Sequence, residues 1–296
     1  MDTVFTLFIN GEEVGKGENM FIAHSFDVTD FVKPGVENEL TVEIRSSIHF
    51  ARNIPLTMAS HTHDYSYDNF ALRRALHTYG WDIAPRIVGA GLWRKVTLDV
   101  LKPERWTEVY LHTDALEKNH AEMSLFWQFT SHRRMLEGYT AHFSMKCGES
   151  VYEETKVLRF TSGMHYIRLA DPKLWEPRNW GAPHLYDCTL TLLFNGEVKD
   201  IYKFRTGIRT VDLIRSEPEP YEKGKFLFEV NGRPFFAMGS NWVPADALHG
   251  ENPGRVREAL RLMAETGSNM IRCWGGSVYE DHEFFDICDE LGMLVW

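Results

Sequence analysis

Apolar residues in the last third of the chain alternate between short runs and helical spacing. The runs at 235–243 and 270–274 are typical of buried parallel strands. Between them, from Arg255 on, apolar side chains recur every three or four positions as far as Ala264 and Gly267 follows, which predicts an amphipathic helix with a glycine stop. The same spacing over 281–291 predicts a second helix, and 293–296 predicts the start of a third strand.

Strands that alternate with helices predict βα units and a parallel sheet. An open doubly wound sheet and a (β/α)8 barrel both fit such units. A nucleotide-binding sheet would carry a glycine-rich phosphate loop after its first strand, whereas residues 240–244 read SNWVP. We therefore expect the first βα units of a TIM (β/α)8 barrel, with a sheet that continues beyond Trp296.

The first two thirds of the chain show the alternating pattern of antiparallel strands. Residues 3–11 alternate and end in an Asn-Gly pair, a strong hairpin signal, and 39–45 alternate again. Residues 122–129 alternate with one exception at Phe126, and turn residues recur about every ten positions after them. A jelly roll and an immunoglobulin-like β-sandwich fit these two stretches, and residues 47–79 form a long connection within the first.

Composition limits the partners of the chain. A formal charge of −10 argues against nucleic acid or an anionic membrane, because both require a basic face. No stretch approaches the roughly 18 apolar residues of a membrane span. The four cysteines are scattered and read as small core residues. The chain begins Met1-Asp2 without a signal peptide, so two locations stay open: cytoplasmic, or periplasmic or secreted if a missing N-terminus carries a signal.

Two tryptophans stand at the ends of predicted barrel strands, each with a polar neighbour. Trp242 follows Asn241, and Trp274 lies two residues after Arg272. An indole covers the apolar face of a pyranose while amide and guanidinium groups bind its hydroxyls, so these residues predict one wall of a sugar subsite. The alternative for either indole is core packing.

Several long ordered strings in the chain resemble those of one enzyme family. GRPFFAMGSNWVPADAL (232–248) and MIRCWGGSVYEDHEFFDICDELGMLVW (270–296) resemble the start of the catalytic barrel of glycoside hydrolase family 2, in the β-mannosidase branch. Residues 2–46 resemble the preceding sugar-binding-like jelly roll, while 174–192 and 204–213 resemble the linker sandwich.

The resemblance implies three domains. These are a galactose-binding-like jelly roll over 1–103 whose N-terminal strands are missing, an immunoglobulin-like β-sandwich over 104–213, and the start of the catalytic TIM barrel over 214–296, truncated in its third strand.

LRRALHTYGWDIAPRIVGAGLWRKVTL (72–98) resembles the block in which a jelly-roll loop reaches the barrel mouth. The resemblance implies that Trp81 and Asp82 contact the terminal sugar. The family pattern has Trp and Gly where this chain has Ile83 and Ala84, which leaves the exact sugar open. The predicted substrate-binding residues are Trp81, Asp82, Asn241, Trp242, Arg272 and Trp274.

The resemblance implies a retaining exo-glycosidase that hydrolyses terminal non-reducing β-D-mannose residues of a β-mannoside oligosaccharide or glycan. Its two catalytic glutamates would lie beyond Trp296, after the fourth and seventh barrel strands. These residues alone are therefore expected to be inactive, and Glu280 is expected to act as a carboxylate at a helix N-terminus. No cofactor is implied, since acid/base and nucleophile are both side chains.

Other interpretations stay open. Another family 2 specificity, such as β-galactosidase or exo-β-glucosaminidase, would use the same stacking and hydroxyl recognition. A noncatalytic carbohydrate-binding protein could be built from the two β domains. His61 and His63 could share a side of a strand, but no third ligand follows at a recognised spacing, so no metal site is predicted. The sequence leaves the oligomeric state open.

Overall fold

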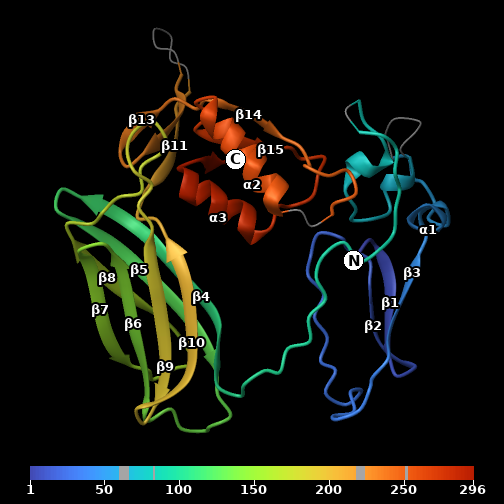
Figure 1. The fold of residues 1–296 in the computed structure, drawn as a ribbon, viewed down its shortest axis with the longest axis horizontal. Helices are drawn as coiled ribbons and strands as arrows, with labels where there is room; N and C mark the ends of the chain where they lie inside the picture. Colours follow the sequence, from blue (N-terminus) through green and yellow to red (C-terminus); the bar gives the residue numbers. More distant parts are fainter. Residues whose placement is uncertain (60–66, 83, 218–223, 251–252) are drawn as a thin grey trace. The chain divides into compact units, whose positions relative to one another are not determined.

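The computed structural model describes residues 1–59, 67–82, 84–217, 224–250 and 253–296 (Figure 1). The chain forms two compact units. The first contains Met1–Leu98, Asn241–Ala259 and Cys273–His282, and the second contains Asp99–Ser240, Leu260–Arg272 and Glu283–Trp296. The mostly β prediction is confirmed, because strands far outnumber helices along the described chain.

The first unit begins with a three-stranded antiparallel sheet in the order β2-β1-β3. The strands are β1 (Val4–Ile9), β2 (Glu12–Gly17) and β3 (Leu40–Arg45). Asn10 and Gly11 connect the first two with φ of 52° and 82°. Positive φ at both central residues is what a two-residue hairpin turn requires, so the Asn-Gly prediction is confirmed.

The connection after β3 contains short helices that the sequence pattern did not predict. They are α1 (Ser47–Arg52), η1 (Tyr67–Asn69) and η2 (Leu76–Tyr79). These helices are too short to show a clear apolar period in the sequence. The Ser46 side chain nevertheless caps α1 by accepting from the backbone N–H of His49. Residues 61 and 63, considered above as metal ligands, lie outside the described residues.

A buried ion pair anchors the segment that carries η2. The Arg74 guanidinium, 2% exposed, donates to both carboxylate oxygens of Asp2 at 2.6 and 2.7 Å. It also donates to the Gly89 carbonyl at 3.1 Å and to the Thr78 hydroxyl, and it lies 5.2 Å from the Tyr79 ring centroid. A buried charge needs this many partners, so the segment is held in one position.

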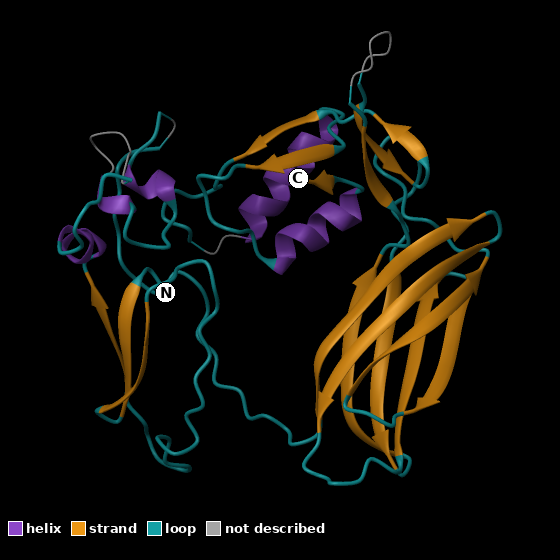
Figure 2. Cartoon of the chain, turned by 180° about the vertical axis from the view of Figure 1, so that it is seen from behind, coloured by secondary structure: helices purple, strands orange, loops and turns teal. Residues whose placement is uncertain are grey.

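The second unit contains a β-sandwich of two antiparallel sheets (Figure 2). One sheet has the order β4-β5-β8, with β4 (Arg105–Glu117), β5 (His120–Thr130) and β8 (Ser162–Ala170). The other has the order β10-β9-β6-β7, with β10 (Glu197–Thr206), β9 (Tyr186–Phe194), β6 (Tyr139–Cys147) and β7 (Ser150–Val157).

Alternation along β5 places its side chains as predicted. Met123, Leu125 and Phe129 are at most 2% exposed and belong to the sandwich core. Phe126, which broke the predicted pattern, is 43% exposed on the outer face. The period of two therefore determines which face each residue joins, and the sandwich prediction is confirmed.

The predicted strand over 235–243 is wrong in its extent. β12 (Phe226–Val230) and β13 (Arg233–Phe235) form a hairpin beside β11 (Val211–Arg215). Phe235 pairs with Phe228 in this hairpin, and a separate strand, β14 (Gly239–Trp242), follows. The Asn-Gly turn at 231–232, with φ of 50° and 69°, directs the chain back and takes Phe235 into the hairpin.

The predicted βα elements at the end of the chain are present. A sheet in the order β14-β15-β16 contains β15 (Met270–Cys273) and β16 (Leu294–Val295), and the latter two are parallel. The helices are α2 (Pro253–Glu265) and α3 (His282–Leu291), and the latter buries Phe284, Ile287 and Cys288. The described elements are the first units expected of a barrel, while the closed barrel stays a prediction.

Trp175 joins the sandwich to these βα elements within the second unit. Its ring is fully buried beside Val230, Met270 and other apolar residues, and Nε1 donates to the Asp289 carbonyl at 2.8 Å. The Arg209 guanidinium covers the ring at 4.4 Å and pairs with Asp289 at 3.4 Å. Trp175 and Arg209 are thus structural, and the predicted domain boundaries at 103 and 213 stay predictions.

Candidate functional site

Two tryptophans from distant parts of the sequence meet in the first unit. The ring centroids of Trp81 and Trp274 lie 6.0 Å apart, with the planes tilted by 45°. Trp81 is 47% exposed and belongs to a tight turn, in which its N–H donates to the Ala84 carbonyl at 2.9 Å. Asp82 lies in this turn and is exposed. An exposed carboxylate thus follows Trp81 directly in the chain.

The Trp274 ring lies directly on the backbone of the turn that follows it. A Cβ on Gly276 would be 2.3 Å from Cζ2 of the indole, so that the ring or the turn would have to shift. The backbone N–H of Trp274 donates to the Trp242 carbonyl at 2.9 Å, as its strand pairs with β14. Glycine at 276 is therefore required for the ring to fold back over the chain.

Trp242 has a different environment. Its ring is 5% exposed, and Nε1 donates to Oε1 of Glu280 at 2.7 Å. Burial raises the pKa of the Glu280 carboxyl, and the hydrogen bond from Trp242 opposes this shift. Sequence reasoning missed this pair, because nothing in the spacing of the two residues relates an indole N–H to a carboxylate.

The other two predicted residues are exposed strand residues. Asn241 belongs to β14 in the first unit, next to Trp242. Arg272 belongs to β15 but falls in the second unit, where its guanidinium lies 5.7 Å from the Trp296 ring centroid. The first unit therefore contains five of the predicted residues, and the position of Arg272 relative to them stays a prediction.

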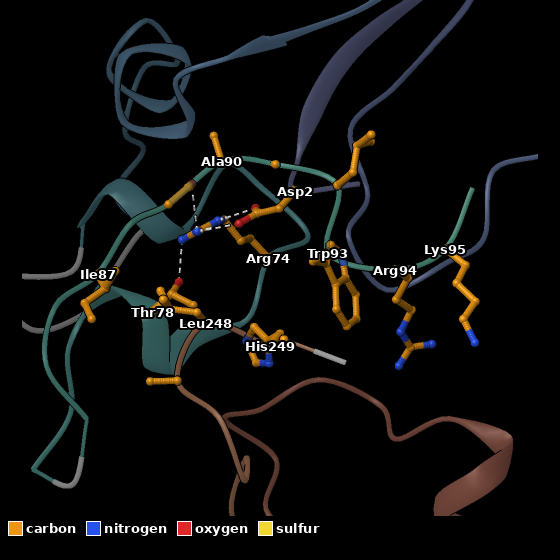
Figure 3. A pocket seen from close by; sticks show the side chains of 15 residues that line it. Asp2, Arg74, Thr78, Ile87, Ala90, Trp93, Arg94, Lys95, Leu248 and His249 are labelled. Carbon is orange, nitrogen blue, oxygen red and sulfur yellow. Dashed lines mark hydrogen bonds and ion pairs between the residues drawn. The ribbon is translucent and has the colours of Figure 1, made fainter. Parts of the chain in front are cut away.

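A pocket of about 510 Å³ also lies in the first unit (Figure 3). Its lining includes Arg74, Trp93 and His249 but none of the six predicted sugar-binding residues. The Arg74 guanidinium is directed at Asp2 and Thr78, as Figure 3 shows, so it serves the fold rather than a ligand. The pocket is therefore separate in its residues from the candidate sugar site.

Sequence reasoning also missed His77, whose ring and backbone both contact Gly276. The two residues are 199 positions apart, so no local pattern relates them.

Among the described residues, no three His, Cys, Asp or Glu side chains are grouped as metal ligands. No helix in the described part of the chain is long and apolar enough to cross a membrane.

Two family models match parts of the chain. The model of the glycosyl hydrolase 2 galactose-binding domain-like family matches residues 1–94, and the model of glycosyl hydrolases family 2 matches 138–209. The β-mannosidase B of Aspergillus flavus is 33% identical over 307 residues, which span 100% of this chain and 35% of that protein. The β-mannosidase B of Thermothelomyces thermophilus is 33% identical over 305 residues, with the same shares.

Solved structures agree with these relatives. The crystal structure of a β-D-mannosidase from Dictyoglomus thermophilum has a TM-score of 0.85 and 34% identity, covering 100% of this chain and 36% of that one. A β-glucuronidase from Bacteroides uniformis has a TM-score of 0.66 at 19% identity, covering 100% of this chain and 32% of that one, and shares the fold alone.

A galactose-binding-like domain followed by a β-sandwich and βα units defines a multidomain protein of the glycoside hydrolase type. The chain belongs to glycoside hydrolase family 2, in which it is a β-mannosidase-like segment. It spans about a third of the length of the curated relatives it matches. The family predicted from the sequence strings is confirmed.

Proposed function

We propose that the whole protein, of which these residues form part, is a retaining exo-glycosidase that removes terminal non-reducing β-D-mannose from oligosaccharides or glycans. The support is the uniform similarity to proteins named β-mannosidase, at 33 and 34% identity over the entire chain. The β-glucuronidase, a protein named for another sugar, matches at 19% only.

The observation that carries the sugar site is the pair formed by Trp81 and Trp274. Their tilted rings make an apolar corner, and Trp81 is half exposed. A pyranose has an apolar face that covers an indole well, and desolvating that face is favourable. Asp82 in the adjoining turn offers two acceptor oxygens to neighbouring sugar hydroxyls.

The remaining residues have supporting roles in this proposal. Asn241 and Arg272 would donate to sugar hydroxyls, and Trp242 would border the subsite from β14. Binding is the whole contribution of these residues, because the acid/base and nucleophile are proposed to lie after the fourth and seventh barrel strands. In a retaining enzyme those two carboxyl groups stand about 5 to 5.5 Å apart.

Hydrolysis of a matched panel of substrates by the whole protein tests the proposal. The panel contains p-nitrophenyl β-D-mannoside, β-D-galactoside, β-D-glucoside and β-D-glucosaminide, with the α-D-mannoside as control. We expect the β-mannoside to give the highest kcat/KM, and proton NMR to show the β-anomer of mannose as the first product.

The other results have distinct meanings. A faster reaction with another β-hexoside would replace mannose by that sugar within the same family. First release of the α-anomer would contradict retention. Absence of hydrolysis, together with calorimetric binding of a β-mannoside, would favour the noncatalytic carbohydrate-binding alternative.

A further inference from the structure

His77 holds one carbonyl group with two donors. Its backbone N–H donates to the Gly276 oxygen at 3.0 Å, and its ring Nδ1 lies 3.1 Å from the same oxygen. A carbonyl oxygen only accepts, so Nδ1 carries the proton. The side chain is 2% exposed, which protects both bonds from competition with water.

The Gly276 peptide group that His77 contacts is also the backbone on which the Trp274 ring packs. The indole packs so closely on Gly276 that no Cβ fits between them, and the N–H of Ser277 closes the turn on the Trp274 carbonyl at 3.3 Å. The ring centroid of His77 lies 6.2 Å from that of Trp274. A movement of the Gly276 peptide would therefore move the indole with it.

We propose that His77 is a positioning residue of the sugar site. By holding the Gly276 carbonyl it fixes the turn over 275–276, and thereby the orientation in which the Trp274 ring faces Trp81. The inference rests on the proposed function only for its effect on hydrolysis, since the contact itself lies within the first unit.

The surroundings of His77 favour a neutral ring. His249 contacts it edge to face with centroids 4.7 Å apart, and the Trp93 ring lies 5.5 Å beyond His249. Nε2 of His249 and Nε1 of Trp93 are buried without a hydrogen-bond partner in the described structure. Two charged imidazoles in contact would repel each other in this buried environment.

The pKa values follow from this environment. Burial lowers the pKa of His77, the carbonyls of Gly276 and Ala247 oppose the shift, and the charge of Arg74 adds to it. Burial and the neighbouring His77 lower the pKa of His249 to about 4.

The charged groups that act on the pair come from several segments. Arg74 precedes His77 on the same segment, Asp246 precedes His249 on the facing segment, and Asp2 comes from the start of the chain. The turn over 274–277 contributes no titratable side chain. Because both folded-state pKa values are lowered, the stability that the neutral pair contributes is fully present above the usual value of 6.5 and is lost as the pH falls through the lowered values.

Two substitutions in the whole protein distinguish the effect of the Nδ1 hydrogen-bond donor of His77 from the effect of protonating its ring. His77→Asn places an amide N–H where Nδ1 was and cannot titrate, whereas His77→Phe keeps the ring shape without a donor. We expect His77→Phe to lower kcat/KM at pH 7 by about tenfold or more through misplacement of Trp274. His77→Asn should stay within about threefold of the wild type, and its activity should persist at acid pH values where the wild type loses it.

His24→Phe is the matched control. His24 Nε2 also contacts a backbone carbonyl, that of Asn19 at 2.8 Å, and its ring packs edge to face on Phe5. This substitution removes an equivalent contact in the same unit but away from Trp274, so kcat/KM should be retained. Should His77→Phe fail to fold, His77→Gln makes the same comparison, because its amide reaches the place of Nε2 instead of Nδ1.

Fluorine NMR of protein labelled with 6-fluorotryptophan tests the inference without activity. The Trp274 resonance is assigned by its absence in Trp274→Phe. We expect it to shift in His77→Phe, to remain in place in His77→Asn and His24→Phe, and to shift on acidification in the wild type but not in His77→Asn.

The outcomes of the two experiments are independent. An unchanged Trp274 resonance in His77→Phe overturns the positioning role, as does equal loss of kcat/KM in His77→Asn and His77→Phe. If the wild type hydrolyses no β-hexoside while the resonance still responds to His77, the positioning role stands and the proposed function fails.

Discussion

The Trp242 indole donates a hydrogen bond of 2.7 Å to the Glu280 carboxylate, and the donor ring is almost fully buried. A buried ionised carboxylate is costly unless a donor compensates for its lost hydration. The pair therefore links the end of β14 to the segment just before α3 within the first unit.

Trp242→Phe should destabilise the whole protein by about 1 to 3 kcal/mol, because the Glu280 carboxylate loses a buried donor. The free energy of unfolding is measured by urea denaturation. Combining the change with Glu280→Ala, which removes the acceptor, gives a double-mutant cycle, and independent, additive effects in that cycle would contradict an energetically important pair.

Glu280→Gln should change the pH dependence of stability. Burial raises the folded-state pKa of Glu280 above the usual 4.5, so the folded protein binds this proton more tightly than the unfolded chain does. The stability that the group contributes is thus present below 4.5 and is lost as the pH rises through the raised value.

Gln keeps an acceptor for Trp242 and does not ionise, so the variant should gain stability relative to the wild type as the pH rises from 4 toward 8. Denaturation midpoints across that range measure the difference, with exposed Glu37→Gln as control. Parallel pH profiles of wild type and Glu280→Gln would contradict the prediction.

Local chemistry made much of the fold predictable. The Asn-Gly pair at 10–11 requires positive φ at both residues, and the spacing over 255–267 fixes the buried face of α2. Phe235 was misassigned because its partner, Phe228, lies across a hairpin whose pairing a single apolar run does not reveal. Local sequence patterns determine where helices and strands form, while the pairing between strands decides which sheet a strand joins.

Only those residues of the candidate site that stand in recognisable motifs or at the ends of predicted strands could be predicted from the sequence. Trp81 and Trp274 could be singled out from motifs, and the structure places their rings in one unit. The contact of His77 with Gly276 spans 199 positions and depends on the tautomer of a buried ring, which leaves no trace in composition or periodicity. Such contacts require the folded chain.

Gly276→Ala should displace the Trp274 ring, because the added Cβ would meet it at 2.3 Å. Overpacking of this kind costs about 1 to 3 kcal/mol of stability, and kcat/KM should fall with the displaced ring. Gly275→Ala is a close control, since its Cβ would meet nothing within 4 Å. Equal kinetics and denaturation midpoints in the two variants would show that the indole moves aside freely.

Asp82→Ala should reduce activity without affecting folding, because Asp82 is exposed in the turn that Trp81 begins. Loss of charged hydrogen bonds to two sugar hydroxyls should raise the barrier by about 2 to 4 kcal/mol, roughly 30- to 700-fold in kcat/KM. Asp30→Ala, at another exposed turn of the same unit, is the control. A variant of Asp82 with wild-type kcat/KM would mean that the carboxylate only shapes the turn.

Trp274→Ala distinguishes a sugar platform from a core residue. The ring is half-buried on Gly276, so removing it should cost less than the roughly 3 to 5 kcal/mol of a core indole. If the ring covers about 80 Å² of apolar sugar surface, its loss should raise the barrier by about 2 kcal/mol, roughly 30-fold in kcat/KM.

Trp180→Ala is the matched control for this change. Trp180 is also half-buried and packs edge to face on Phe235, with the Arg233 guanidinium 4.2 Å from its ring centroid. Trp180→Ala should lose stability and keep its specific activity. Trp274→Ala should keep most of its stability and lose activity. A large drop in the denaturation midpoint of Trp274→Ala with unchanged kcat/KM would assign the indole to packing and remove it from the sugar site.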